Sequence, residues 1–288
     1  TDRERVEYSI DWGNEFLTSL RWILTMFGYS MVGVLVAGAI LSRITLWGRQ
    51  YWRATGGFFT GRETRVGAWV LVVVLMLLMV IGVRLTVVLS YQGRDMFNAL
   101  QGAAEAMSND DGKTLDAAEE MFWNSLWLFG LLATIHVVRT MIELYIGSMF
   151  EIRLRAFMPT RVTADWLTDL AFYRNRFVNT GIDGADAKIQ PGVDNPDQRI
   201  EIDIANVATS SRRLVFGSGG SSTNGVIPAI MTICSFTLIL WDLSGPMEIF
   251  GVDVPRAMVW MVYLFVLVST VVAFWLGHPL IRLYFLRE

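Results

Sequence analysis

The sequence is poor in the residues that build covalent and metal-centred sites. Its 288 residues include one cysteine, Cys234, and two histidines. A lone cysteine inside an apolar stretch has no partner, so the sequence excludes an internal disulfide framework and a cysteine metal site. It also has no His-x-x-x-His pair, no Cys-x-x-Cys pair and no Gly-x-Ser-x-Gly turn. Hydrolase and metalloenzyme chemistry therefore have little support.

A loop that binds nucleotide phosphates is also missing. Gly112-Lys113-Thr114 resembles the end of such a loop, but the pattern needs a glycine where Met107 stands. The glycine-rich stretch at 217–225 has no lysine to supply the positive charge that phosphates require. We therefore expect no catalytic residue, metal site or cofactor in this sequence, and we expect any ATP-binding residues to lie elsewhere in the protein.

Charged residues are scarce and apolar residues are abundant. Only 18% of the residues are charged, 53% are hydrophobic and the mean hydropathy is +0.43. A water-soluble protein rarely has this balance, which predicts an integral membrane protein. Because backbone groups find no water in the hydrocarbon core, a span needs about 20 mostly apolar residues in helix. Five stretches meet this requirement, the fourth being the shortest: 22–41, 67–90, 121–145, 225–241 and 257–276.

Basic residues are concentrated in alternate loops and so predict the topology. Between the first two spans, five arginines accompany the single acid Glu63, and residues 146–223 carry nine lysines and arginines. Residues 91–120 instead have two basic residues against seven acids. Because loops rich in lysine and arginine stay in the cytoplasm, we expect a multi-pass protein with its N-terminus outside and the end at residue 288 inside.

The loop between the first two spans is expected to contain a helix lying on the inner leaflet. It mixes aromatic side chains with arginine, as in Trp47, Arg49, Trp52 and Arg53, which is typical of an interfacial helix. A simple anchor and a moving elbow that transmits conformational change are both open. We therefore divide the chain into an outer tail, peripheral helix and elbow at 1–66, and a transmembrane region at 67–288.

Ionisable residues inside the predicted spans are candidates for function. His136, Arg139 and Glu143 are three and four residues apart, which places them on one helical face. A charge near the bilayer centre costs about 2.5–3.5 kcal/mol on insertion scales. These groups therefore line a wet cavity, as solute contacts or a proton relay, or Arg139 and Glu143 neutralise each other as a pair. Arg84 is a further candidate for the cavity, or alternatively an interfacial anchor.

The run from Asp194 to Ile200 predicts the start of a helix. Asn195 suits the N-cap, Pro196 the first helical position, Asp197 the positive end of the helix dipole and Gln198 a capping box. Isoleucines at 200, 202 and 204 would also suit a strand. A plain helix cap and a contact site for a partner both explain this run in the cytoplasm.

Four segments together resemble one family. The run Asn195-Pro196-Asp197-Gln198-Arg199-Ile200 is similar to a motif of the SbmA/BacA-like uptake proteins and the related peroxisomal ABC half-transporters. The segment 90–101, ending in Asn98-Ala99-Leu100-Gln101, and the residues 165–174 resemble the segments that precede that motif in the family. The run 244–258 is most similar to the mycobacterial branch. A longer polar insertion between Arg174 and Asp194 departs from the family pattern.

The resemblance implies an all-α polytopic membrane protein with an ABC exporter-like transmembrane fold and an extra N-terminal peripheral helix. It also implies a homodimer around a large water-filled cavity in the bacterial inner membrane. The cargo would be a hydrophilic solute such as cobalamin, a peptide or a bleomycin-like antibiotic. This chain would supply the peripheral helix and four of six spans, with the last two helices and any nucleotide-binding domain following Glu288.

Site residues follow from the same resemblance. Asn98 and Gln101 would shape the outer mouth of the cavity. An inner coupling region at about 150–213 would meet an ATPase that binds ATP and Mg²⁺, through Arg155, Trp166, Asn195, Pro196, Asp197, Gln198, Arg199 and Asp203. A proton-coupled importer without an ATPase and a non-transporting membrane scaffold or receptor are the alternatives. The lipid bilayer is an expected partner, and nucleic acid is not.

Overall fold

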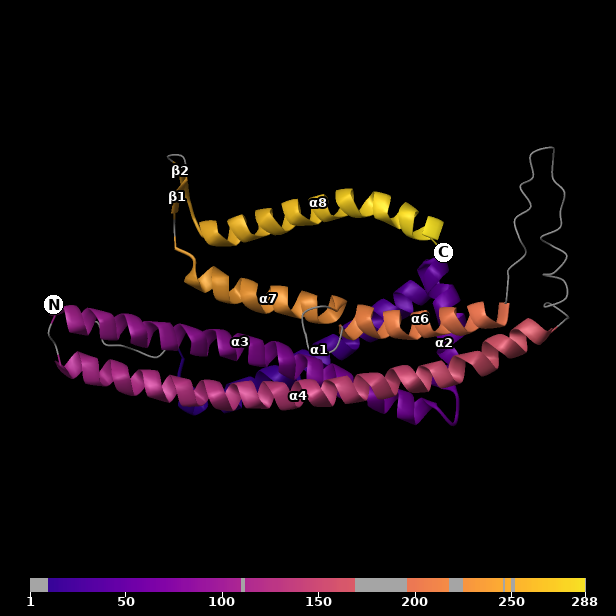
Figure 1. Ribbon diagram of the computed structural model, residues 1–288, viewed down its shortest axis with the longest axis horizontal. Helices are drawn as coiled ribbons and strands as arrows, with labels where there is room; N and C mark the ends of the chain where they lie inside the picture. Colours follow the sequence, from indigo (N-terminus) through magenta and orange to yellow (C-terminus); the bar gives the residue numbers. More distant parts are fainter. Residues whose placement is uncertain are drawn as a thin grey trace. The chain divides into compact units, whose positions relative to one another are not determined.

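The computed structural model describes residues 10–109, 112–168, 196–217, 225–245, 247–249 and 252–287. The polar insertion and Asn195 lie outside these residues. The chain forms two compact units, residues 1–229 and 230–288. The helices are α1 (Trp12–Ile44), α2 (Leu46–Thr60), α3 (Arg65–Asn109), α4 (Gly112–Leu167), α6 (Pro196–Phe216), α7 (Val226–Leu243) and α8 (Ala257–Arg287), as Figure 1 shows.

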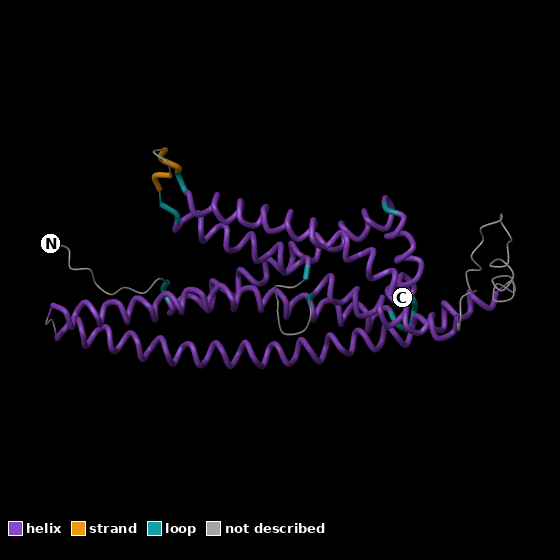
Figure 2. Tube along the Cα trace, turned by 45° about the horizontal axis from the view of Figure 1, so that its top comes forward, coloured by secondary structure: helices purple, strands orange, loops and turns teal. Residues whose placement is uncertain are grey.

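The predicted all-helical membrane fold is confirmed. Four helices, α1, α3, α4 and α8, are long and apolar enough to cross a membrane. The fourth predicted span corresponds to α7, a shorter apolar helix that is not among these four. Between α7 and α8 lies one small addition to the helical pattern, an antiparallel hairpin of β1 (Met247–Ile249) and β2 (Val252–Val254), drawn in orange in Figure 2.

Two helices are much longer than the spans that we predicted within them. α3 has 45 residues and α4 has 56. At 1.5 Å per residue, α4 measures about 84 Å, against a hydrocarbon core of about 30 Å. Both helices are therefore much longer than a crossing of the hydrocarbon core requires. The C-terminal end of α4 extends about 30 Å past the predicted span, which ends at residue 145.

The core of the first unit lies where α3 packs side by side with α4 (Figure 1). Apolar residues of α3 recur every three or four positions and are almost fully buried, as are Leu75, Met76, Met79 and Val83. This spacing places them on one helical face. By contrast, α1 has no buried residue. A helix that is apolar and exposed in this way is suited to lipid; its assignment as a peripheral membrane helix stays a prediction.

α1 and α2 meet at a sharp corner built from Thr45 and Gly48. Thr45 has an extended backbone, ends α1 and caps α2, its hydroxyl accepting a hydrogen bond from the Gly48 N–H at 3.1 Å. The Gly48 backbone lies so close to the Leu41 carbonyl oxygen that a Cβ at this position would collide with it. Glycine is therefore required here by the close approach of two helices.

Gly48→Ala is expected to destabilise the protein by about 2 kcal/mol or more, because the α1–α2 corner has to open to accommodate the methyl group. Gly38→Ala in α1 is the matched control, since a Cβ there has open space. It is expected to be neutral or to stabilise the helix by up to about 1 kcal/mol. Thermal unfolding of the two variants in detergent checks both; equal midpoints would contradict the corner geometry.

The predicted elbow is the helix α2, and its aromatic residues face the other helices as well as the surface. Phe58 is 2% exposed and contacts Phe150 and Phe157 of α4, with ring centroids 6.0 and 5.7 Å apart. Trp47 and Trp52 are exposed. α2 thus packs against the C-terminal part of α4, while its exposed tryptophans suit an interfacial position.

In the second unit, α7 and α8 are joined by polar contacts. The hydroxyls of Thr237 and Tyr263 hydrogen bond at 2.8 Å, and the Met258 N–H donates to Ser244 Oγ at 3.2 Å. Arg256 has a left-handed backbone, with φ 57°, and its guanidinium lies 4.0 Å from the ring centroid of Trp241. This cation–π contact links the end of α7 to the residue that precedes α8.

Candidate functional site

Arg139 and Glu143 form a buried ion pair at the contact between α3 and α4. Arg139 Nη1 lies 2.6 Å from Glu143 Oε2, and the two side chains are 4% and 7% exposed. The same guanidinium donates to the Leu78 carbonyl of α3 at 2.9 Å and to Thr140 Oγ1 at 3.1 Å. The interpretation as a neutralising pair is therefore confirmed, and the charges are kept away from lipid by the neighbouring helix.

His136 lies one turn before this pair and is half-buried. Its Nδ1 is buried and has no hydrogen-bond partner within the described parts of the chain. The three residues predicted on one face are therefore brought together. Arg139 and Glu143 pair with each other, whereas Nδ1 of His136 and Nε of Arg139 are both buried without a hydrogen-bond partner among the described residues. A buried ring nitrogen without a hydrogen bond lowers the stability of the fold. The predicted proton-relay role of His136 stays a prediction.

Arg84 connects α3 to the peripheral helix α1. Its guanidinium lies 2.5 Å from Glu15 and 3.0 Å from the Ser19 hydroxyl, and its Cζ lies 5.5 Å from the ring centroid of Trp22. Both charged side chains are about nine-tenths buried, at 13% and 14% exposure. The residue thus fixes α1 on α3. Glu15 was not predicted as the partner of Arg84, because the two residues lie 69 positions apart.

Further polar contacts join the start of α1 to α3, and α3 to the N-terminal part of α4. Trp12 Nε1 donates to Asp95 at 2.8 Å, and Gln92 Nε2 donates to the Ser125 carbonyl at 3.0 Å. Asn98 is half-buried and Gln101 is exposed, one and two turns further along α3. Their predicted place at the mouth of a cavity stays a prediction.

The predicted helix start after Asn195 is confirmed at Pro196, the first residue of α6. The segment is a helix and not a strand, and it buries Ile204 and Ala208. Asp197 and Arg199 belong to its first turn, whereas Gln198 and Asp203 are exposed. On α4, Arg155 is exposed and Trp166 is half-buried near the end of the helix. Their predicted contact with an ATPase stays a prediction.

The strongest link between α4 and α6 was not predicted. Glu151 of α4 accepts hydrogen bonds from the Thr209 hydroxyl and from Arg212 Nε, the latter at 3.1 Å. Arg212 also donates to the Gly217 carbonyl at 3.2 Å, close to the end of α6. Glu151 therefore fixes the register of α6 on the part of α4 beyond the predicted span. Its partners lie 58 and 61 positions away, so local spacing carried no signal.

These contacts serve to hold long helices together. Within the described ranges, no group of three or more His, Cys, Asp or Glu side chains is placed to hold a metal ion. The long apolar helices of the described residues define a multi-pass membrane protein. Residues 62–288 match the family described as ABC transporter transmembrane region 2, and the chain belongs to that family.

The curated relatives are longer than the chain. It is 30% identical over 280 residues to an uncharacterized ABC transporter ATP-binding protein of Haemophilus influenzae, covering 97% of this chain and 41% of the relative. A second such protein from the same organism is 28% identical with the same coverage. The inner membrane ABC transporter ATP-binding protein YddA of Escherichia coli is 24% identical over 62% of this chain and 27% of its own length. The chain thus spans about two-fifths of the first two relatives.

Proposed function

We propose that this chain is the membrane half of an ATP-driven importer of hydrophilic compounds, working as a homodimer by alternating access of a water-filled cavity. One observation carries the proposal. At the arginine-rich end, α4 projects well past its predicted span and α6 is fixed to it by Glu151. A helix pair of this kind transmits movement between a membrane region and a domain docked at its tip.

The energy source in this proposal is ATP with Mg²⁺, bound by a nucleotide-binding domain of the full-length protein. The name ATP-binding protein that the relatives carry supports it. The cargo class follows from the resemblance to the mycobacterial branch of the SbmA/BacA-like proteins: cobalamin, peptides or bleomycin-like antibiotics. The bacterial inner membrane is the proposed location, and the name of YddA, an inner membrane ABC transporter ATP-binding protein, supports it. In this arrangement the N-terminus is outside and residue 288 inside.

Coupling is assigned to the inner ends of α4 and α6, with Arg155, Trp166 and the first turn of α6 meeting the ATPase. Asp197→Ala in the full-length protein is expected to lower solute-stimulated ATPase activity at least about fivefold, the lower bound for an allosteric coupling energy. Membrane insertion and basal ATPase activity are expected to persist. Glu201→Ala, an exposed acid on the same helix, is the matched control. Unchanged stimulation in Asp197→Ala would remove the coupling assignment.

A proton-coupled importer is the second candidate, and the unpartnered Nδ1 of His136 beside the Arg139–Glu143 pair favours it. This candidate predicts uptake that depends on a pH gradient and needs no ATP. The gradient dependence is then expected to disappear in His136→Ala and Glu143→Gln. Uptake that keeps the same pH dependence in both variants would exclude the relay. A non-transporting scaffold or receptor is the remaining class. An uptake-deficient host that carries the protein and accumulates no labelled cobalamin or peptide would favour it.

A further inference from the structure

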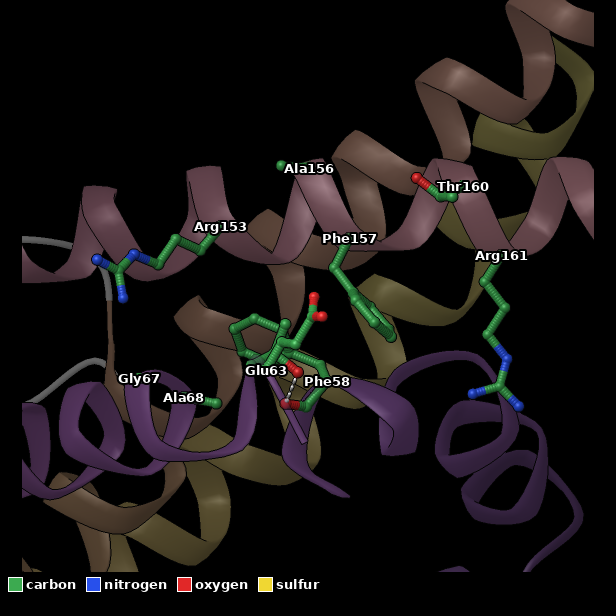
Figure 3. A pocket seen from close by; sticks show the side chains of 10 residues that line it. Phe58, Glu63, Gly67, Ala68, Arg153, Ala156, Phe157, Thr160 and Arg161 are labelled. Atoms are coloured by element: carbon green, nitrogen blue, oxygen red, sulfur yellow. Dashed lines mark hydrogen bonds between the residues drawn. The ribbon is translucent and has the colours of Figure 1, made fainter. Parts of the chain in front are cut away.

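A cavity of about 680 Å³ lies at the arginine-rich end of the first unit, between α2, α3 and α4. The residues that carry the argument are Phe58, Glu63, Ala68, Arg153, Phe157 and Arg161. Phe58 and Ala68 are buried and form an apolar floor, whereas both arginines are exposed. Figure 3 shows Phe157 pointing toward Phe58 and Glu63. The two arginines lie at opposite ends of the cavity. The volume falls in the range of small-molecule sites.

The two arginines are available to a ligand. Arg153 and Arg161 are eight residues apart on α4, which separates their backbones by about 12 Å along the helix axis. No ion pair within the described residues involves either of them. Each guanidinium lies over a glycine: a Cβ at Gly67 would be 2.8 Å from Arg153 Nη1, and one at Gly57 would be 2.5 Å from Arg161 Nη1. The glycines thus make room for the charges beside the cavity.

The position of the cavity selects the kind of ligand. It lies where the polar turn at Glu63 and Thr64 meets Ala68, at the start of the apolar part of α3. One wall is therefore polar and basic, and the floor is aromatic and apolar. Glu63 contributes one negative charge, but Arg62 and Arg65 flank it in the chain, so the local charge stays positive. A basic pocket at the cytoplasmic end of membrane helices suits the phosphate of an anionic lipid.

We infer that this cavity binds an anionic phospholipid. The phosphodiester accepts hydrogen bonds from one of the two guanidiniums, the other arginine adds its positive charge to the wall of the cavity, and the glycerol and upper acyl chains cover Phe58, Phe157 and Ala68. Arginine is suited to this role because its planar fork donates two hydrogen bonds to one phosphate. A free phosphate would use the arginines but leave the apolar floor uncovered. The inference depends neither on the cargo nor on the energy source.

The test uses the full-length protein in detergent, titrated with phosphatidylglycerol and phosphatidylcholine and followed by native mass spectrometry. Phosphatidylglycerol is expected to bind at least tenfold more tightly. Arg153→Gln with Arg161→Gln is expected to weaken phosphatidylglycerol binding about 30-fold, and Glu63→Gln to strengthen it about fivefold. Arg155→Gln is the matched control, an exposed arginine of α4 that does not line the cavity. It is expected to change binding less than twofold.

Several results would overturn the inference. These are unchanged binding in the double glutamine variant, an equal loss in Arg155→Gln, and no gain in Glu63→Gln. If the double glutamine variant does not fold, Arg153→Lys with Arg161→Lys replaces it: it is expected to keep the preference for phosphatidylglycerol, and losing that preference counts against the site. Inorganic phosphate or the acyl-free headgroup glycerophosphoglycerol displacing the lipid at equal concentration would show a phosphate site instead.

Discussion

Replacing Glu143 by leucine is expected to lower the free energy of unfolding by about 3–5 kcal/mol, because the change leaves a buried charge without its partner. Arg139 is 4% exposed and enclosed between α3 and α4. The Leu78 carbonyl would still accept one of its hydrogen bonds, but the guanidinium would have no counter-charge. Unfolding in mixed detergent micelles, followed by tryptophan fluorescence, measures the loss.

Two further variants separate the lost charge from lost packing. Arg139→Met combined with Glu143→Leu is expected to recover most of the stability, since apolar side chains of similar volume replace a buried pair at little cost. Glu119→Leu, at an exposed position of α4, is expected to change stability by less than about 0.5 kcal/mol. A double variant as unstable as Glu143→Leu would contradict the account of this pair.

Replacing Glu151 by alanine is expected to release α6 from α4. The carboxylate accepts hydrogen bonds from Thr209 and Arg212, and both side-chain charges are at least about four-fifths buried, at 15% and 21% exposure. Hydrogen bonds to a charged group contribute about 1.5–3 kcal/mol. Faster amide hydrogen exchange across α6, by about tenfold or more, is therefore expected. Solute stimulation of the ATPase in the full-length protein is expected to fall with it.

Glu201→Ala is the control for this variant, since Glu201 is an exposed acid on α6 itself. In Glu201→Ala, amide hydrogen exchange across α6 is expected to keep the rate that it has in the unmodified protein. If Glu151→Ala left exchange of α6 unchanged, the link between the two helices would not depend on this carboxylate. If exchange rose but ATPase stimulation stayed normal, α6 would have no part in coupling.

The sequence allowed the helical elements to be predicted wherever a local pattern defines them. Twenty apolar residues identified the spans in α1, α3, α4 and α8, and a proline after a capping residue identified the start of α6. The Arg139–Glu143 pair was among the predictions because its partners are four residues apart on one helix. Helix lengths were underestimated, because hydropathy marks only the part of α3 or α4 that crosses lipid.

Contacts between distant segments were beyond prediction. Two ion pairs join different helices: Arg84 with Glu15, and Glu151 with Arg212. The paired residues are 69 and 61 positions apart in the chain, and a single sequence does not show which distant residues pair. The arginines of the basic cavity fall in the same group, because their arrangement depends on the packing of α2, α3 and α4. The hairpin between α7 and α8 was also missed, since its strands have only three residues each.

The proposed import function is tested most directly with the full-length protein in sealed vesicles that contain ATP and an ATP-regenerating system. Molecules whose cytoplasmic side faces the lumen are expected to accumulate labelled cobalamin or peptide against a gradient. Two conditions separate the energy sources: ADP enclosed in place of ATP and without the regenerating system, and a protonophore added to vesicles that contain ATP. Accumulation should stop with ADP alone and continue with the protonophore. Accumulation that stops with the protonophore, or no accumulation with any of these solutes, would contradict an ATP-driven importer.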